Sequence, residues 1–137
     1  MTSDTAIKLV LFETMENLIL PCDKAPENTE IDYTRQSPFV RYFDQPTVKD
    51  QFELGTDGFN LHKGVFHIEI CFPGNAGVVA PANIADIILP IFKRGTDLEY
   101  NGVKIRCEKC RIVTAYVENS WYILPIHITY RAIMENA

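Results

Sequence analysis

The sequence lacks the features that mark membrane proteins, secreted proteins and the common enzyme classes. No apolar run approaches the ~18 to 20 residues that span a bilayer, and no basic segment precedes an apolar one at the N-terminus. The 4 cysteines do not suit a disulfide framework, because a chain of 137 residues buries enough core without such links. We therefore expect a single domain over residues 1–137, in a reducing cytoplasm, with no membrane partner.

Positive charge is also scarce. The chain has 13 Lys and Arg against 18 Asp and Glu, which gives a formal net charge of −5. A protein that binds nucleic acid on its own needs a basic surface that releases counterions from phosphates, so this balance argues against that class. The balance is compatible with a protein that DNA passes without specific binding.

No motif of a known catalytic class is present. The glycine loop at residues 73–77 lacks the Gly-Lys-Ser/Thr ending of a phosphate-binding loop. Cys107 and Cys110 have the spacing of half a zinc site, but the other cysteines are single and distant. Odd spacing along a strand also predicts that these two side chains point to opposite faces. We expect a protein that is not an enzyme and that holds no metal or other cofactor.

The clearest structural pattern is a strand over residues 64–72. A period of two places alternate side chains on opposite faces of a sheet. One face is apolar and predicts a core contact, whereas the other is free to meet solvent or a partner. The apolar face comprises Phe66, Ile68, Ile70 and Phe72, and the other face comprises Val65, His67, Glu69 and Cys71.

Apolar residues at helical spacing predict a first helix over residues 3–19, which Pro21 ends. Leu9, Phe12 and Ile19 widen its apolar stripe beyond one packing face. Such a stripe indicates either a helix buried on two sides or one that contacts another subunit. We predict a second helix over residues 81–92, with a kink or an end near Leu89 because Pro90 clashes with a regular helix.

Strands and turns account for most of the remaining chain. Residues 39–43 are aromatic and β-branched, and Asn101-Gly102 predicts a hairpin between residues 98–100 and 103–106. A second hairpin is predicted between residues 110–117 and 121–134. Pro125 in its last strand indicates an edge position or a bulge.

Two segments show no clear period, and we predict loops there. Residues 22–35 are polar. In residues 44–63, Pro46, Gly55 and Gly58 break any period. The one exception is a possible pairing segment at residues 51–54. A loop of that length is usually functional or disordered, so we expect residues 44–63 to be mobile.

Together these elements predict an α/β domain of the α+β kind. Its mixed or mainly antiparallel sheet packs against two main helices, in the order α-β-β-α-β-β-β.

Two side-chain groups are candidates for chemistry. His67, Glu69 and His127 lie on the non-core faces of strong strands, so pairing of those strands would let them bind a metal or share a proton. The alternative is that they are ordinary polar residues on the exterior of a sheet. Four cations form a basic patch if their elements meet and are otherwise scattered surface charges. They are Arg41, Lys93, Arg94 and Arg131.

The chain resembles a known family in several segments. They are Pro38 to Arg41, Gly64 to Ile70, the Gly74 to Gly77 loop, Ala85-Asp86, Phe92 to Gly95, and Tyr122 to Ile126. In order and composition they are similar to the tail terminator proteins of long-tailed bacteriophages, including the minor tail protein U family. The likeness covers roughly residues 38–132.

The resemblance implies a hexameric ring that caps the tail tube, stops its polymerisation and offers a surface to the head. The implied partners are further copies of the chain, the tail tube protein and a head–tail connector protein. The implied location is the tail or neck of the virion, reached from the host cytoplasm during assembly. Rival interpretations are another neck or head-completion component, or a small metal-dependent enzyme that uses His67, Glu69 and His127.

We expect three groups of residues to serve these roles. In the 44–63 segment, the residues expected to bind a partner are Gln51, Phe52, Gly55, Gly58 and Phe59. Phe39 and Arg41, in the strand over residues 39–43, are expected to form a subunit contact. Lys93 and Arg94, in the basic turn after the second helix, are expected to serve in docking.

Overall fold

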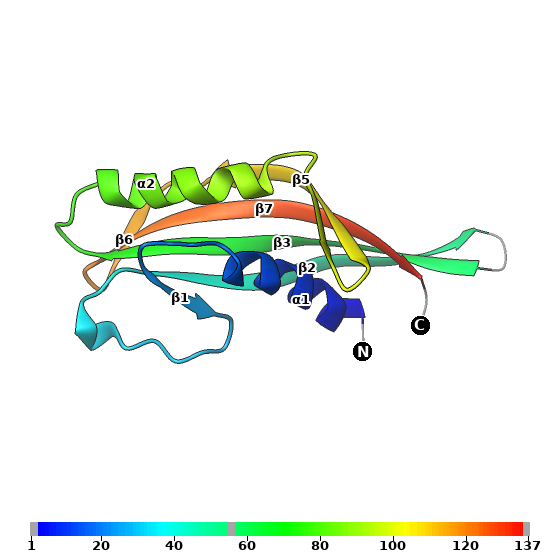
Figure 1. Ribbon diagram of the computed structural model, residues 1–137, viewed down its shortest axis with the longest axis horizontal. Coiled ribbons are helices and arrows are strands. Elements are labelled where there is room, and N and C mark those ends of the chain that lie inside the picture. The colour runs from blue at the N-terminus through cyan, green and yellow to red at the C-terminus, as the bar shows by residue number, and fades with distance from the viewer. Residues whose placement is uncertain (1–2, 55–56, 136–137) are drawn as a thin grey trace.

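A computed structural model describes residues 3–54 and 57–135. Its elements confirm the predicted fold class, since two helices pack on a mixed sheet (Figure 1). The helical elements are α1 (Ser3–Glu16), η1 (Tyr33–Arg35), α2 (Val79–Ile88) and η2 (Leu89–Phe92). The strands are β1 (Asp23–Pro26), β2 (Phe39–Leu54), β3 (Asp57–Pro73), β4 (Asp97–Tyr100), β5 (Val103–Ile112), β6 (Tyr116–Glu118) and β7 (Trp121–Glu135).

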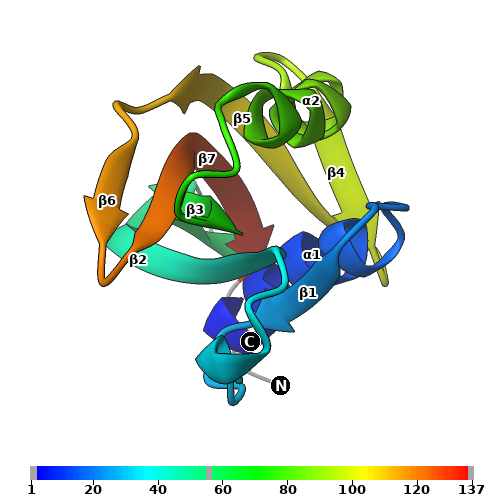
Figure 2. The same cartoon turned by 90° about the vertical axis from the view of Figure 1, so that its left-hand side faces the viewer.

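The sheet has the strand order β1-β2-β3-β7-β5-β4, and β6 pairs with the start of β7. β1 and β2 are parallel, and the other described pairs are antiparallel. The sheet curls around the helices, as the end view shows (Figure 2). We call the face that the helices cover the inner face and the opposite one the outer face.

The hydrophobic core lies between the inner face and both helices. The predicted alternation in residues 64–72 is confirmed, because Phe66, Ile68 and Ile70 are fully buried in this core. Burying such a side chain contributes roughly 1.5–3 kcal/mol. From the helices the core receives Ile7, Val10, Leu11, Met15, Ile84, Ala85 and Ile88. Within the described chain, no helix combines the length and apolarity that a membrane crossing requires.

Two local predictions are confirmed. α2 ends at Ile88 and gives way to the 3₁₀ turn η2, so the helix stops where Pro90 would otherwise clash. The β4–β5 hairpin turns at Asn101 and Gly102, whose φ values are 52° and 78°. Positive φ at both positions matches the twist of a two-residue hairpin.

The prediction of a loop over residues 44–63 is wrong. β2 continues to Leu54 and β3 begins at Asp57, with paired residues from Val48↔Lys63 to Leu54↔Asp57 after an irregularity at residues 46–48. The absence of a hydrophobic period misled the prediction, because backbone hydrogen bonds between two strands do not depend on the side-chain pattern. The mobility of the segment stays a prediction.

Residues 22–35 are likewise not purely a loop. They contain β1, which pairs with the start of β2, and the 3₁₀ turn η1. The first helix is also shorter than predicted, because α1 ends at Glu16. Ile19 lies beyond it and is 91% exposed.

Pro125 lies in β7, which is central in the sheet, but at the point where β5 has ended and β6 has not begun, so the predicted edge position holds only locally. Its carbonyl accepts a hydrogen bond of 2.9 Å from the Val113 N–H, just after β5 ends. The N–H and C=O of one strand residue point the same way. The missing N–H of Pro125 therefore faces the gap between β5 and β6, where the sheet loses no ladder hydrogen bond.

Candidate functional site

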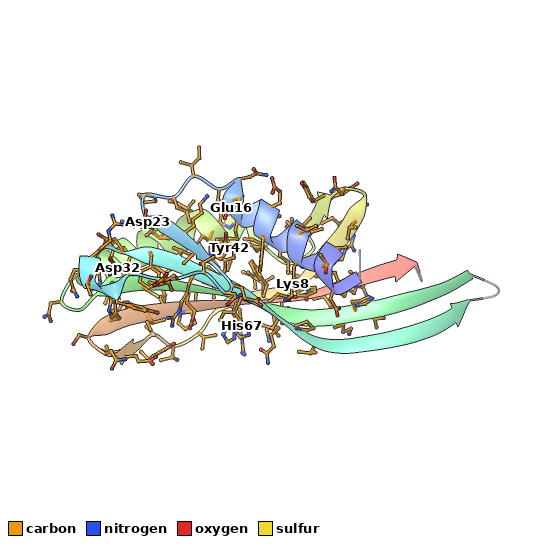
Figure 3. All side chains as sticks on the ribbon, turned by 90° about the horizontal axis from the view of Figure 1, so that it is seen from below. Lys8, Glu16, Asp23, Asp32, Tyr42 and His67 are labelled. Carbon is orange, nitrogen blue, oxygen red and sulfur yellow. The ribbon has the colours of Figure 1, made fainter. Side chains whose placement is uncertain are left out.

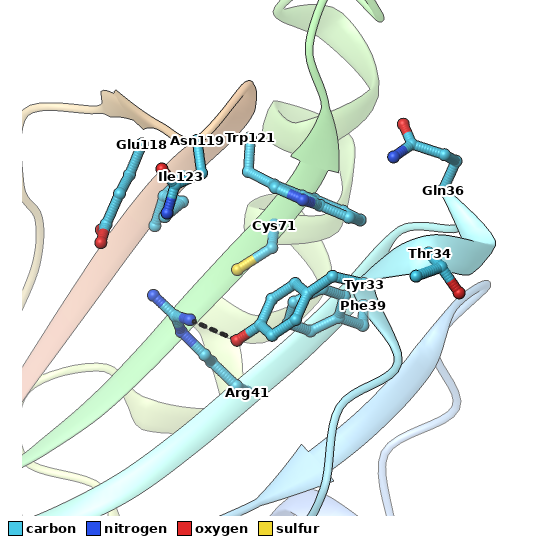
Figure 4. Close-up of a pocket in the computed structure, with 10 residues that line it drawn as sticks. All are labelled: Tyr33, Thr34, Gln36, Phe39, Arg41, Cys71, Glu118, Asn119, Trp121 and Ile123. Atoms are coloured by element: carbon cyan, nitrogen blue, oxygen red, sulfur yellow. Dashed lines mark hydrogen bonds between the residues drawn. The ribbon is translucent and has the colours of Figure 1, made fainter.

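An aromatic pocket of about 430 Å³ opens on the outer face (Figure 4). The turn η1 lies over the start of β2 and β7, and Asp32 holds that turn by accepting the Thr34 N–H at 3.0 Å. The ring centroids of Tyr33, Phe39 and Trp121 lie 5.2 to 5.8 Å apart. Such edge-on aromatic packing stabilises the wall of the pocket.

Arg41 lines the pocket and is held by hydrogen bonds within the chain. Arg41 Nε donates to Glu69 Oε1 at 2.7 Å, and the Tyr116 hydroxyl donates to Glu69 Oε2 at 3.0 Å. Arg41 Nη1 also donates to the Tyr33 hydroxyl at 3.4 Å. Burial raises the pKa of the Cys71 thiol to about 12, although Arg41 partly offsets it. The thiol is therefore protonated at neutral pH and is a poor nucleophile.

A histidine pair lies beside this pocket. His67 and His127 are register partners on β3 and β7, and their ring centroids are 4.4 Å apart. Phe43 stacks on His67 at 4.5 Å, and Gln45 Oε1 lies 2.7 Å from His67 Nε2. Burial, and then the neighbouring His127, lowers the pKa of His67. Burial, and then Arg111, lowers the pKa of His127.

The structure brings together two of the three residues in the candidate metal-binding group, His67 and His127. Glu69 lies one row further along the sheet, opposite Pro125, and its carboxylate is held by Arg41 and Tyr116. Among residues 3–54 and 57–135, no group of three or more His, Cys, Asp or Glu side chains is placed to hold a metal ion.

The prediction that Cys107 and Cys110 point to opposite faces is wrong. β5 has an irregularity between Cys107 and Lys109, so Cys107 pairs with Tyr130 and Cys110 with Ile128. These two partners share the inner face, and both cysteines pack on the core. An inserted residue reverses the alternation that odd spacing predicts. Burial, and then Cys110, raises the pKa of Cys107 to about 12.

The four cations of the candidate basic patch lie on separate elements, as the alternative of scattered surface charges expects. Arg41 is bound to Glu69, whereas Lys93 and Arg94 are exposed in the turn after η2. Arg131 instead joins a group that the sequence analysis missed. Five cations lie on the outer face of β3, β7 and β5, and we call them the basic strip. They are Lys63, Arg106, Lys109, Arg111 and Arg131.

The basic strip follows from strand register. Lys63 and Arg106 flank Arg131 across three neighbouring strands, Lys109 pairs with Thr129, and Arg111 pairs with His127. The irregularity in β5 puts Arg106 and Lys109 on one face despite their odd spacing. The only sequence signal was the density of basic residues between positions 104 and 111, which by itself indicates no face.

The other predicted site residues fall on different elements. Phe39 and Arg41 line the aromatic pocket. Gln51 and Phe52 lie on β2, Gly58 and Phe59 lie on β3, and Phe52 pairs with Phe59. Gly55 lies outside the described residues.

A buried polar network lies at the opposite, inner side of the β2–β3 hairpin. The Tyr130 hydroxyl donates to Asp44 Oδ1 at 2.5 Å, and Lys8 Nζ donates to Asp44 Oδ2 at 3.3 Å. Lys8 Nζ also lies 3.5 Å from Glu27 Oε1, which accepts the Asp44 N–H at 3.0 Å. The network ties α1, β7 and Glu27, the residue after β1, to β2 where the hairpin leaves the body of the domain.

Comparison with known proteins adds a family and a fold. A family model described as phage tail terminator protein matches residues 6–130. No curated protein sequence matches the chain. One solved structure is similar over 96% of each chain, with a TM-score of 0.70 and 16% identity, which shows a shared fold. A chain from the virion of a native gene transfer agent particle aligns over 97% of each chain, with a TM-score of 0.47 and 15% identity.

Proposed function

The chain belongs to the phage tail terminator family, and we propose that it caps the tail tube as a ring of identical subunits. The family match spans residues 6–130 and is the observation that carries the proposal. Membership assigns the protein a structural role in the phage tail and a place in the virion. In the proposed role a hexameric ring stops tube polymerisation and offers a surface to the head.

The β2–β3 hairpin supports a role in contacts between proteins. β1 pairs with the edge of β2 that faces away from β3, but only as far as Tyr42. β2 then runs on to Leu54. At ~3.4 Å per residue this section is about 40 Å long. It reaches past the body of the domain (Figure 1). A hairpin of this length bridges to a neighbouring protein without moving the core, so we assign it to the contact with the tail tube protein.

The named residues divide between the proposed contacts. Gln51, Phe52, Gly55, Gly58 and Phe59 belong to the hairpin and its tip. Phe39 and Arg41 line the aromatic pocket, which we assign to a contact between subunits. Lys93 and Arg94 are exposed beside the core, and we assign them to docking on the connector protein. DNA passes through the ring without specific binding, and assembly takes place in the host cytoplasm.

Other neck components remain the closest rival, since a head-completion connector would use a similar ring on the portal side. The metal-dependent enzyme has less support, because Glu69 is engaged by Arg41 and Tyr116 and His67 Nε2 lies 2.7 Å from Gln45 Oε1.

Electron microscopy of the protein mixed with uncapped tail tubes tests the proposal. We expect rings at one end of tubes that stop growing. A hairpin-shortened variant that joins Asp50 to Leu61 through Asn-Gly should leave tubes uncapped, because those two residues are register partners that a two-residue turn can link. Lys93→Ala with Arg94→Ala is the matched control, which should cap tubes and fail to join heads. Uncapped tubes beside wild-type protein would transfer the assignment to the head-side connector.

A further inference from the structure

We propose that copies of this chain associate head to tail, with the basic strip of one copy against an acidic surface on the next. The inference rests on the proposed ring and names the two faces that build it. The acidic surface comprises the carboxylates of α1 and β1 and of the loop that follows β1 as far as Asp32.

The basic strip carries more positive charge than its own surroundings neutralise. Only Arg106 forms an ion pair within the described chain, with its Nε 2.9 Å from Asp97 Oδ1. Lys109, Arg111 and Arg131 are exposed. Neighbouring strands lie ~4.8 Å apart, so cations in adjacent register positions repel one another. In a chain of net charge −5, this local positive excess attracts an external anionic surface.

The acidic surface carries the opposite excess. Residues 3–35 hold three basic side chains, and two of them are occupied within the fold. Lys8 contacts Glu27 and the buried Asp44, and Lys24 donates to the Glu16 carbonyl at 2.9 Å. Asp23 and Glu30 are exposed and form no ion pair with described residues. The acidic residues of this segment are Asp4, Glu13, Glu16, Asp23, Glu27, Glu30 and Asp32.

The two surfaces lie on different sides of the molecule. α1 and β1 cover one side of the curled sheet, and β5, β6 and β7 form the other (Figure 2). Figure 3 shows Glu16 and Asp23 on the first side and His67, which neighbours the strip, on the second. The acidic surface of one copy therefore cannot neutralise the basic strip of the same copy. A contact between two different surfaces is heterologous and generates a ring when the rotation closes.

Exposed apolar side chains accompany the acidic surface. Ile19 is 91% exposed beside it, and Leu9 is partly exposed on α1. Charges steer and orient an association, and apolar area stabilises it. A surface that combines carboxylates with exposed apolar area suits a protein partner, and its carboxylates repel the phosphates of DNA.

Two charge-reversal variants test the contact. Lys109→Glu with Arg111→Glu reverses the strip, and Asp23→Lys with Glu30→Lys reverses the acidic surface. All four positions are exposed, so folding should be unaffected. Asp86→Lys with Glu99→Lys makes the same charge change as the acidic-surface reversal at two exposed positions outside both surfaces and serves as the control. Sedimentation would be measured at about 0.1 M and about 1 M salt, where the Debye length falls from ~10 to ~3 Å.

We expect the wild type and the control to assemble at low salt, and each reversed variant to associate at least tenfold more weakly. An equimolar mixture of the two reversed variants should assemble again, because each restores opposite charges for the other. A mixture that stays monomeric overturns the proposal. So does a wild type that forms no oligomer either alone or on tube ends. A strip variant that assembles normally but loses salt-dependent binding of a DNA duplex would assign the strip to nucleic acid instead.

The assembly and capping results separate this inference from the proposed function. Rings that respond to charge reversal but never cap tubes would refute the capping role and keep the interface. Rings that cap tubes and assemble normally in both reversed variants would refute the proposed interface and keep the capping role.

Discussion

Replacing Gly64 by Ala should destabilise the domain through one specific steric conflict. Gly64 faces Tyr130 across β3 and β7. An added Cβ would lie 2.7 Å from Tyr130 Cζ and 2.8 Å from the Gln45 carbonyl oxygen, well inside van der Waals contact. Tyr130 is 1% exposed and its hydroxyl is bound to Asp44, so the ring cannot swing away without losing that hydrogen bond.

The magnitude follows from two costs. Overpacking a core typically costs about 1–3 kcal/mol. Weakening the buried hydrogen bond to Asp44 costs about 1–3 kcal/mol more. We expect a loss of about 3 kcal/mol, which for a domain of this size lowers Tm by about 10 °C.

Thermal and urea unfolding of four proteins would measure this effect: wild type, Gly64→Ala, Tyr130→Phe and the double variant. Tyr130→Phe removes the hydroxyl, so the added methyl should cost at least ~1 kcal/mol less in that background. A Gly64→Ala protein within ~0.5 kcal/mol of wild type would refute the steric argument, because surface substitutions without a special role give changes of that size. Additive effects in the double variant would show that the cost lies elsewhere.

Two further predictions concern titrating groups. The folded-state pKa values of His67 and His127 are lowered, first by burial and then by His127 and Arg111 respectively, so the unfolded chain binds more protons below pH ~6.5. Wild-type Tm should therefore fall as the pH falls below that value, and the fall should shrink in a His67→Gln, His127→Gln variant; an unchanged pH profile would contradict the assignment. Burial raises the pKa of Cys71 and Cys107 to about 12, so both thiols should react with a disulfide reagent at pH 8 only as fast as the protein unfolds. A Cys22→Ser, Cys110→Ser variant isolates that signal, and rapid labelling of the folded variant would disprove the burial argument.

Local chemistry explains which features could be predicted. Alternation in residues 64–72 identifies the core strand, because one face must leave water whatever the strand pairs with. Asn101-Gly102 identifies a hairpin, since both residues tolerate positive φ. Pro90 predicts the end of α2 through its own ring. Each feature depends on a few adjacent residues.

The errors arose where a distant strand decided the outcome. Residues 44–63 have no period, yet they form a hairpin because β3 pairs with β7 as well as with β2. The irregularity in β5 placed Cys107 and Cys110 on one face, and nothing near them in the sequence signals it. Pro125 fits a central strand only because β5 ends beside it.

The sequence by itself determined the fold class, the inner face of the sheet and the family. These depend on hydrophobic period, turn residues and segment order, which are properties of the chain before it folds. Only the tertiary structure decided the aromatic pocket, the histidine pair and the basic strip. They depend on register, and in a sheet a shift of one residue moves every side chain to the opposite face.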